Sequence, residues 1–207
     1  MSVTIGVLAL QGGYQAHACC MQQLGCQTIY VRTSQQLARC QALIIPGGES
    51  TTLLHLLHTS GLTEPIATAI AEGLPIFGTC AGAILLAKQV KPTQSSLGCI
   101  DMTIERNAYG RQLDSFTQPP DSNDFDKGGD GNEDELIFIR APRITSVGAA
   151  VKVLLTCQGD AVLVEQGCFL AATFHPELMH ASGVHKYFLR SLEEMDRYDE
   201  IIQTSCT

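Results

Sequence analysis

Basic residues are scarce in this sequence: 13 lysines and arginines stand against 21 aspartates and glutamates, which gives a formal net charge of -8 at pH 7. A chain of this charge is a poor partner for nucleic acid or for an anionic membrane surface, so we expect neither. Seven acids and one base fall between residues 121 and 135 and sum to -6, which leaves -2 for the rest of the chain. The acidity is therefore confined to one segment.

Signals for export, membrane insertion and zinc binding are also missing. The N-terminal residues 1–5 (MSVTI) lack the basic stretch of a signal peptide, and no apolar run is long enough to cross a membrane. Paired CxxC motifs, the usual sign of a zinc site, do not occur. We therefore expect a cytoplasmic protein that holds no metal and needs no cofactor.

The nine cysteines are an odd number and are scattered along the chain. Four of them (Cys19, Cys20, Cys99 and Cys168) fall within apolar stretches that we expect to be buried. Buried free thiols in a reducing compartment therefore explain the pattern better than a disulfide framework.

At 207 residues the chain is long enough for one domain with a full hydrophobic core and too short for two, so we take residues 1–207 as one domain. Strands and helices alternate in the first half. The strands are predicted at residues 3–10, 28–31, 42–45 and 75–77, and the helices at residues 14–24, after 50–52, at 63–72 and from 81 to about 88. This alternation is typical of βαβ units, in which helices cover both faces of a parallel sheet. The predicted fold class is therefore α/β.

The second half has shorter predicted strands, at residues 100–105, 136–139, 151–155, 162–165 and 169–173, and a closing helix at residues 182–195. Residues 118–135 are polar, rich in Gly and Asp, and nearly free of apolar side chains. Such a segment cannot bury enough surface to offset the entropy of ordering it. We expect it to be an acidic, mobile surface insertion.

The most informative local feature is the segment at residues 78–82 (GTCAG), between a predicted strand and a predicted helix. It has the G-x-nucleophile-x-G form of a nucleophile elbow, with Cys80 in place of serine. Small residues two positions before and after the nucleophile avoid collisions at such a strained turn. The following helix favours the thiolate with the positive end of its dipole. An ordinary buried cysteine beside a glycine-rich turn is the alternative.

Among the six histidines, His175 is the best candidate for a base that activates Cys80. It follows an apolar strand and precedes Pro176, which stiffens the backbone before Glu177. If the carboxylate of Glu177 engages one imidazole nitrogen, the other is left to face Cys80. A simple strand-end turn is the alternative. For the remaining histidines, we expect surface or packing roles at His17, His55 and His58 and solvated side chains at His180 and His185.

A third segment, residues 46–50 (PGGES), follows the strand predicted at 42–45. In an open parallel sheet this position lies at the carboxyl edge, where ligands bind, and glycines there let the backbone approach a ligand closely. The backbone N–H groups of Gly48 and Ala81 are then candidates for an oxyanion hole. The segment lacks the lysine of a Walker phosphate loop. A plain turn is the alternative.

In this order, the three segments resemble the class I (triad) glutamine amidotransferase family. Within it, the whole pattern is similar to the glutaminase subunits of pyridoxal 5'-phosphate (vitamin B6) synthase. The similarity rests on six motifs at residues 6–12 (GVLALQG), 46–52 (PGGESTT), 77–82 (FGTCAG), 105–107 (ERN), 138–142 (FIRAP) and 174–178 (FHPEL). It extends from Val3 to about Leu192 and is interrupted only by the acidic insertion.

The resemblance implies a flavodoxin-like three-layer α/β domain that hydrolyses L-glutamine to L-glutamate and ammonia through a cysteine thioester. It implies that Cys80 is the nucleophile, His175 the base and acid, and Glu177 the orienting carboxylate. The residues implied to bind glutamine are Gly48, Glu49, Ser50, Arg106, Ile139 and Arg140. The resemblance further implies a heteromeric complex with a (β/α)8-barrel synthase subunit. That subunit receives ammonia through a tunnel, combines it with ribose 5-phosphate and glyceraldehyde 3-phosphate, and raises the low activity of the free glutaminase.

Two other functions stay open. One is another enzyme on the same scaffold, such as a γ-glutamyl hydrolase or a glutaminase that serves a different synthase, although the ERN and FIRAP motifs argue against it. The other is a thiol sensor based on reversible oxidation of Cys80, which would not need His175 and Glu177. The sequence also departs from the family at Ala16, where an acidic residue is usual before the histidine of the first helix. Docking to the partner is the property that this departure puts in question.

Overall fold

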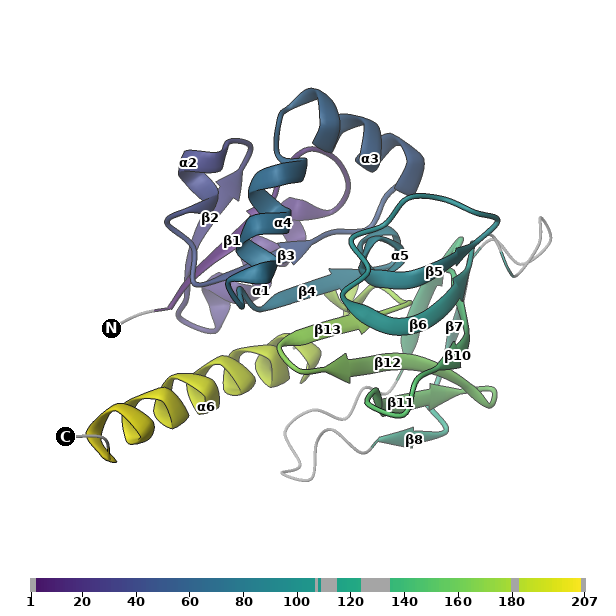
Figure 1. Cartoon of the computed structure of the whole chain (residues 1–207). Coiled ribbons are helices and arrows are strands. Elements are labelled where there is room, and N and C mark those ends of the chain that lie inside the picture. Colours follow the sequence, from purple (N-terminus) through teal and green to yellow (C-terminus); the bar gives the residue numbers. More distant parts are fainter. Residues whose placement is uncertain (1–2, 107, 109–114, 124–134, 180–182, 206–207) are drawn as a thin grey trace.

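The computed structural model describes residues 3–106, 108, 115–123, 135–179 and 183–205, and its centre is an eight-stranded sheet (Figure 1). The strands of this sheet are β1 (Thr4–Leu8), β2 (Gln27–Val31), β3 (Ala42–Ile45), β4 (Ile76–Thr79), β8 (Ser122–Asn123), β11 (Lys152–Cys157), β12 (Asp160–Gln166) and β13 (Phe169–Ala172). Their order is β2-β1-β3-β4-β13-β12-β11-β8. The first five strands pair in parallel, and the pairs from β13 to β8 are antiparallel.

Helices cover both faces of this sheet. They are α1 (Tyr14–Gln23), α2 (Ser34–Leu37), α3 (Ser50–Thr59), α4 (Thr63–Ala71), α5 (Ala81–Leu86) and α6 (Gly183–Ser205). In β3, Ala42 and Ile44 pack with side chains of α1 and α6, whereas Leu43 and Ile45 pack with side chains of α2 to α5. All four side chains are fully buried, because successive residues of a strand point to opposite faces and both faces are covered. The predicted three-layer α/β fold is confirmed.

Two smaller sheets lie beside the main one. The strands β5 (Ala87–Lys91), β6 (Ile100–Glu105) and β10 (Arg143–Val147) form one in the order β10-β6-β5, and β7 (Ser115–Gln118) pairs with β9 (Leu136–Ile139) in the other. The helix predicted from residue 81 to about 88 is therefore too long. It ends at Leu86, because Ala87 and Val90 are buried in a strand that pairs in parallel with β6. None of the described helices is both long and apolar enough to span a membrane.

The acidic insertion predicted at residues 118–135 is only partly a loop. Gln118 ends β7, and Ser122–Asn123 form β8 at the edge of the main sheet. The backbone N–H of Asp121 donates to the carbonyl oxygen of Thr156 at 2.8 Å. The start of the segment is therefore paired with β11 rather than solvated as we expected. Residues 124–134, on which most of that prediction falls, lie outside the described residues.

The cysteines are free at all eight described positions, but their burial differs from the prediction. Cys19 is exposed, and Cys20, Cys99 and Cys168 are only partly buried; the buried thiols are those of Cys26, Cys80 and Cys157. The apolar run that contains Cys19 and Cys20 forms α1, in which Ala18 and Met21 turn one face to the core. A helix buries one face and not its whole circumference, so an apolar run does not bury every residue in it.

The topology brings four separate segments to one edge of the sheet. The strands β1, β3, β4 and β13 are parallel, so the residues that follow them all emerge at the same side. These residues are Gly12 and Gly13 after β1, 46–50 after β3, Cys80 after β4 and 174–177 after β13. The candidate site is built at this edge.

Candidate active site

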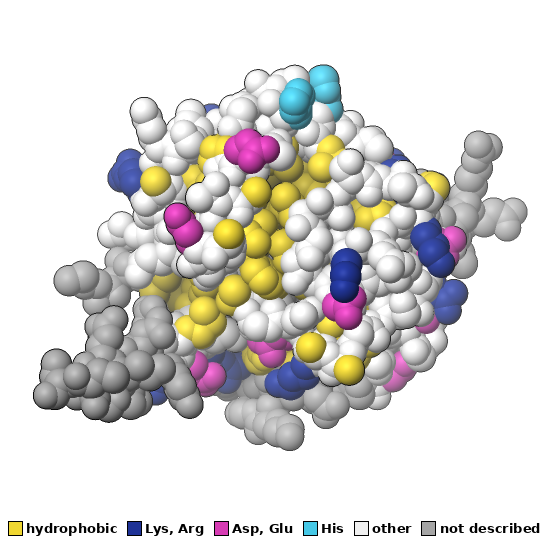
Figure 2. All heavy atoms as spheres, in the orientation of Figure 1, with side chains coloured by type: hydrophobic (Ala, Val, Ile, Leu, Met, Phe, Trp, Pro, Cys, Tyr) yellow, Lys and Arg dark blue, Asp and Glu magenta, His cyan; other side chains and the backbone are white. Residues whose placement is uncertain are grey.

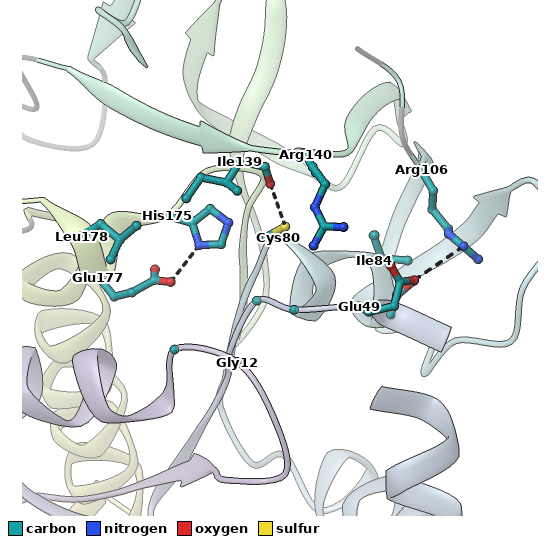
Figure 3. A pocket seen from close by; sticks show the side chains of 14 residues that line it. Gly12, Glu49, Cys80, Ile84, Arg106, Ile139, Arg140, His175, Glu177 and Leu178 are labelled. Atoms are coloured by element: carbon teal, nitrogen blue, oxygen red, sulfur yellow. Dashed lines mark hydrogen bonds and ion pairs between the residues drawn. The ribbon is translucent and has the colours of Figure 1, made fainter. Parts of the chain in front are cut away.

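A pocket of about 290 Å³ opens at the carboxyl edge of the sheet (Figure 3). Its lining contains every predicted site residue except Ala81, which follows Cys80 in the chain. As Figure 3 shows, His175 and Glu177 lie on one side of Cys80, and Arg106 and Glu49 lie on the other. The volume is at the small end of ligand pockets, which are roughly 300–1,000 Å³, and suits a molecule of amino-acid size.

Cys80 adopts a backbone conformation that non-glycine residues rarely have, with φ 47° and ψ -102°. Its N–H donates to the carbonyl oxygen of Ala172 in β13 at 2.8 Å, which fixes the turn between β4 and α5. The neighbouring glycines leave no room for side chains: a Cβ atom on Gly78 would lie 2.7 Å from the backbone of Gly82. This is the strained strand-to-helix turn that the GTCAG segment predicts.

His175 and Glu177 sit at the start of a short 3-10 helix, η1 (Pro176–Leu178), for which His175 is the residue before the first turn. Nδ1 of His175 lies 2.8 Å from Oε1 of Glu177, whose side chain is almost fully buried. Nε2 of His175 is buried and, within the part of the chain that the structure describes, has no hydrogen-bond partner. In Figure 3 this free nitrogen lies on the side of Cys80. Catalytic hydrogen bonds are often long or poorly aligned until substrate binds, so this geometry is compatible with a nucleophile and its base.

The electrostatics favour a protonated imidazole at His175. Burial alone lowers its pKa, but the interactions with Cys80 and Glu177 outweigh burial and raise the pKa to about 10. The pKa of Glu177 lies below its usual range: burial raises it, but His17 and His175 act more strongly in the other direction. At neutral pH the site therefore pairs an imidazolium with an ionised carboxylate beside the sulfur of Cys80.

The far end of the pocket carries charges of both signs. Nη2 of Arg106 lies 3.9 Å from Oε1 of Glu49, and the side chain of Arg106 is mostly buried. Gln94, which the sequence did not single out, joins two predicted site residues. Its Oε1 atom accepts hydrogen bonds from Oγ of Ser50, at 3.0 Å, and from Nη1 of Arg106.

The remaining predicted residues form the walls. Arg140 has φ 44°, a second non-glycine residue in the left-handed region, and its side chain extends into the pocket beside Cys80 (Figure 3). The carbonyl oxygen of Ile139 lies 3.9 Å from the sulfur of Cys80. Gly48 lies next to Gln11, whose Nε2 atom donates to the carbonyl oxygen of Glu49 at 2.7 Å and ties this loop to the end of β1.

The structure contradicts the prediction for one histidine, and the burial of His17 agrees with the packing role that was one of its two predicted alternatives. His185, expected to be solvated, is fully buried, as is His17. Nδ1 of His17 lies 2.9 Å from Nε2 of His185, so α1 and α6 meet through two imidazoles beneath the sheet edge. The histidines visible on the face in Figure 2 lie over α3, which carries the exposed His55 and His58. No periodicity in the sequence distinguishes the buried histidines from the exposed ones, because burial of His185 depends on the packing of α6 against α1. His180 lies outside the described residues.

Comparison with known protein families shows to which family the chain belongs. The SNO glutamine amidotransferase family matches residues 7–194 of the chain. The chain belongs to the SNO glutamine amidotransferase family. It is therefore a glutamine amidotransferase with the fold and the overall motif order that its sequence predicts.

Individual relatives of this amidotransferase agree along nearly their whole length. The chain is 48% identical to a protein named pyridoxal 5'-phosphate synthase subunit PdxT from Solibacter usitatus, over 91% of this chain and 98% of the relative. The protein of the same name from Thermotoga maritima is 44% identical, over 91% of this chain and 99% of the relative. A crystal structure described as a glutamine amidotransferase superposes with a TM-score of 0.82 at 41% identity, and covers 91% of this chain and 98% of the other.

Proposed function

We propose that this amidotransferase is the glutaminase subunit of a pyridoxal 5'-phosphate synthase, with Cys80, His175 and Glu177 as its catalytic triad. The observation that carries the proposal is one cluster: a strained cysteine, an imidazole with a raised pKa and a buried carboxylate 2.8 Å from it, all in a pocket of amino-acid size. Relatives that share 44–48% of their residues with this chain bear the name of that synthase's subunit. The similarity covers 91% of this chain and 98–99% of these relatives, which supports a shared role.

In the proposed mechanism, the thiolate of Cys80 attacks the carboxamide carbon of glutamine. The negative charge that develops on the carboxamide oxygen is stabilised by the backbone N–H groups of Gly48 and Ala81. The imidazolium of His175 gives its proton to the departing nitrogen, so ammonia leaves and a thioester with Cys80 remains. His175, now neutral, takes a proton from water as that water attacks the thioester. Glutamate is then released, and Cys80 and His175 return to their starting states.

The charged end of the pocket explains selection of an amino acid. Free glutamine carries an α-carboxylate and an α-ammonium group, and both need partners of opposite charge when they leave water. We assign the α-carboxylate to Arg106 and Arg140 and the α-ammonium group to Glu49. Gly48, Ser50 and the backbone of Ile139 complete the walls.

The partner is a (β/α)8-barrel synthase subunit that receives the ammonia. The test is to measure glutamate and ammonia formed from glutamine by the purified chain, with and without that subunit. We expect activity to rise when the subunit is added. Cys80→Ala and His175→Asn should each lower turnover on the order of 10⁴-fold or more while the variants still bind the subunit. Full activity of Cys80→Ala would refute the triad, and failure of the wild-type chain to bind the subunit would refute the pathway.

A further inference from the structure

A line of buried polar side chains continues from Glu177 away from the pocket. His17 in α1, Thr79 at the end of β4 and His185 in α6 have at most 1% of their surface exposed. Nε2 of His17 lies 3.3 Å from Oε2 of Glu177 and 3.1 Å from Oγ1 of Thr79. Nδ1 of His17 lies 2.9 Å from Nε2 of His185. Three elements that are distant in the sequence therefore converge behind the carboxylate.

The two oxygens of Glu177 have different surroundings. Oε1 accepts a hydrogen bond from Nδ1 of His175 at 2.8 Å. Oε2 is buried and makes no hydrogen bond of ordinary geometry within the described residues. Nε2 of His17 lies 3.3 Å from it and is within hydrogen-bond distance of Oγ1 of Thr79 at the same time. A buried, ionised oxygen without a donor is unfavourable, so a small approach of the His17 ring is favoured.

Two arrangements of the protons satisfy the distances among His17, His185 and Thr79. A neutral imidazole has one N–H and one acceptor nitrogen. To donate to a carboxylate, His17 must carry its proton on Nε2, and its Nδ1 must then accept from Nε2–H of His185. In the other arrangement Nδ1–H of His17 donates to His185 and the hydroxyl of Thr79 donates to Nε2. The ionised carboxylate of Glu177, 3.3 Å from Nε2, favours the first arrangement, in which His185 donates to Nδ1.

His17 acts through this N–H and not through a full charge. Burial lowers the pKa of His17 to about 4, against the attraction of Glu177, and burial holds the pKa of His185 well below its ordinary value. Both rings are therefore neutral at neutral pH. A neutral donor stabilises the carboxylate of Glu177 without competing with His175 for the role of its cationic partner.

We propose that His17 is a positioning residue of the active site: its Nε2–H, held in place by His185, orients the carboxylate of Glu177 toward His175. The inference rests on the proposed triad. His17 does not line the pocket, so it reaches the substrate only through Glu177 and His175. The expected consequence of its loss is a His175 imidazole that is less well oriented to activate Cys80, with little change in the affinity for glutamine.

Alkylation of Cys80 by iodoacetamide reports its activation by His175 without glutamine. The readout is the ratio of the rates near pH 6 and near pH 9.5, followed by mass spectrometry of the peptide that contains Cys80. A thiolate held by an imidazolium reacts already near pH 6, where an isolated thiol with a pKa of about 8.5 reacts slowly. The titratable groups of the cluster are Glu177, His17, His185, His175, Cys80 and Cys20.

The series compares His17→Leu, His17→Gln and Met21→Ala. His17→Leu removes the donor, and we expect the ratio and the kcat of the assembled synthase to fall about tenfold, with KM changed less than about twofold. The amide of His17→Gln has a donor at the position of Nε2 and an acceptor for His185, so it should stay within about threefold of the wild type. Met21→Ala opens a cavity under the same helix without touching Glu177, and should lower stability but not the ratio.

Two results would overturn the proposal: a folded His17→Leu variant with a wild-type ratio, or a His17→Gln variant as defective as His17→Leu. If His17→Leu does not fold, ¹⁵N NMR of the histidine-labelled wild-type chain decides instead. A proton on Nδ1 of His17 would refute the proposal, and a proton on Nε2 would support it. The alkylation ratio and the NMR measurement need no turnover of glutamine, so their failure is distinguishable from failure of the proposed function, which is seen when the wild-type synthase releases no ammonia from glutamine.

Discussion

Gly82 packs against the carbonyl oxygen of Ile45 so closely that a Cβ atom on Gly82 would lie 2.0 Å from that oxygen. The contact joins the first turn of α5 to the end of β3, and so sets the distance between Cys80 and the PGGES segment. A methyl group here must push backbone against backbone, which is costlier than crowding a flexible side chain. We therefore expect Gly82→Ala to lower the free energy of unfolding by about 3 kcal/mol or more. Urea unfolding followed by circular dichroism measures it, since the chain has no tryptophan.

The control for this change is Gly73→Ala. Gly73, unlike Gly82, has a positive φ, +87°, and a Cβ atom there would meet nothing within 4 Å. Its substitution should cost only the backbone strain, about 1 kcal/mol. Equal losses in the two variants would show that the contact between Gly82 and Ile45 does not constrain the elbow.

The pH dependence of stability follows from the two buried histidines. The pKa of His17 is lowered from 6.5 to about 4, mainly by burial, and that of His185 is lowered well below 6.5. The unfolded chain therefore takes up protons that the folded chain refuses, and stability decreases as the pH falls below about 6.5. His17 alone should account for a loss of about 3 kcal/mol by pH 4. Glu177, whose pKa is lowered, adds a loss in the same direction as the pH falls further.

The contribution of His175 to the pH dependence of stability has the opposite sign. Its pKa is raised to about 10, so its contribution is fully present below about pH 6.5 and is lost as the pH rises toward 10. Unfolding in urea at a series of pH values should therefore show maximal stability near pH 6.5. His58→Gln, at an exposed position on α3, is the control and should leave the curve unchanged. A stability that stays constant between pH 6.5 and 4.5 would contradict the burial of neutral imidazoles at His17 and His185.

Much of the fold was predictable because the local pattern and the final environment agree. The strands predicted at residues 42–45, 100–105 and 136–139 have the bounds that the structure gives them. An apolar run that contains two isoleucines and ends at a Pro-Gly-Gly turn leaves few alternatives for β3. At residues 87–91 the pattern and the environment disagree: the sequence continues a helix, but pairing with β6 draws the chain into a strand. Tertiary pairing of this kind leaves no local signal.

The site likewise has parts that the sequence predicts and parts that it does not. The elbow at Cys80 and the short spacing from His175 to Glu177 are local, so the sequence indicates them directly. Gln94 and His17 act across the fold, through contacts with residues 12 to 168 positions away, and only the assembled structure reveals them. His17 was indeed expected to have no more than a surface or packing role.

The left-handed conformation of Arg140 predicts a conflict between stability and function. A non-glycine residue at φ 44° is strained, and such strain is typical of residues held in place at a ligand site. Arg140→Gly should raise the free energy of unfolding by about 0.5 kcal/mol, because glycine tolerates this region, yet it should raise KM for glutamine about tenfold. Gln158→Gly, at φ 52° in the turn between β11 and β12, should give the same stability gain with unchanged KM. Steady-state kinetics and urea unfolding of both variants check this, and an unchanged KM in Arg140→Gly would remove Arg140 from the substrate site.

Gln94 predicts an effect on substrate affinity from a residue that is not expected to contact the reacting atoms. Its Oε1 atom accepts from both Ser50 and Arg106, and so holds a hydroxyl and a guanidinium at the charged end of the pocket. In Gln94→Leu the guanidinium of Arg106 loses the hydrogen bond that holds it in place. Its side chain must then be ordered again each time glutamine binds. We expect KM to rise about tenfold while kcat stays within about twofold, because Cys80 and His175 are untouched.

Gln89→Leu is the matched control. Gln89 is exposed on β5, and within the described residues its Oε1 atom accepts a single long hydrogen bond, 3.4 Å, from Thr103, so its loss should leave both constants unchanged. Comparing the change in kcat with the change in kcat/KM of Gln94→Leu also distinguishes the roles of the two ends of the pocket. A fall in kcat equal to the loss in kcat/KM in Gln94→Leu would mean that Arg106 acts in the transition state instead of holding the amino-acid end of glutamine. The α-carboxylate would then have to be reassigned to Arg140 alone.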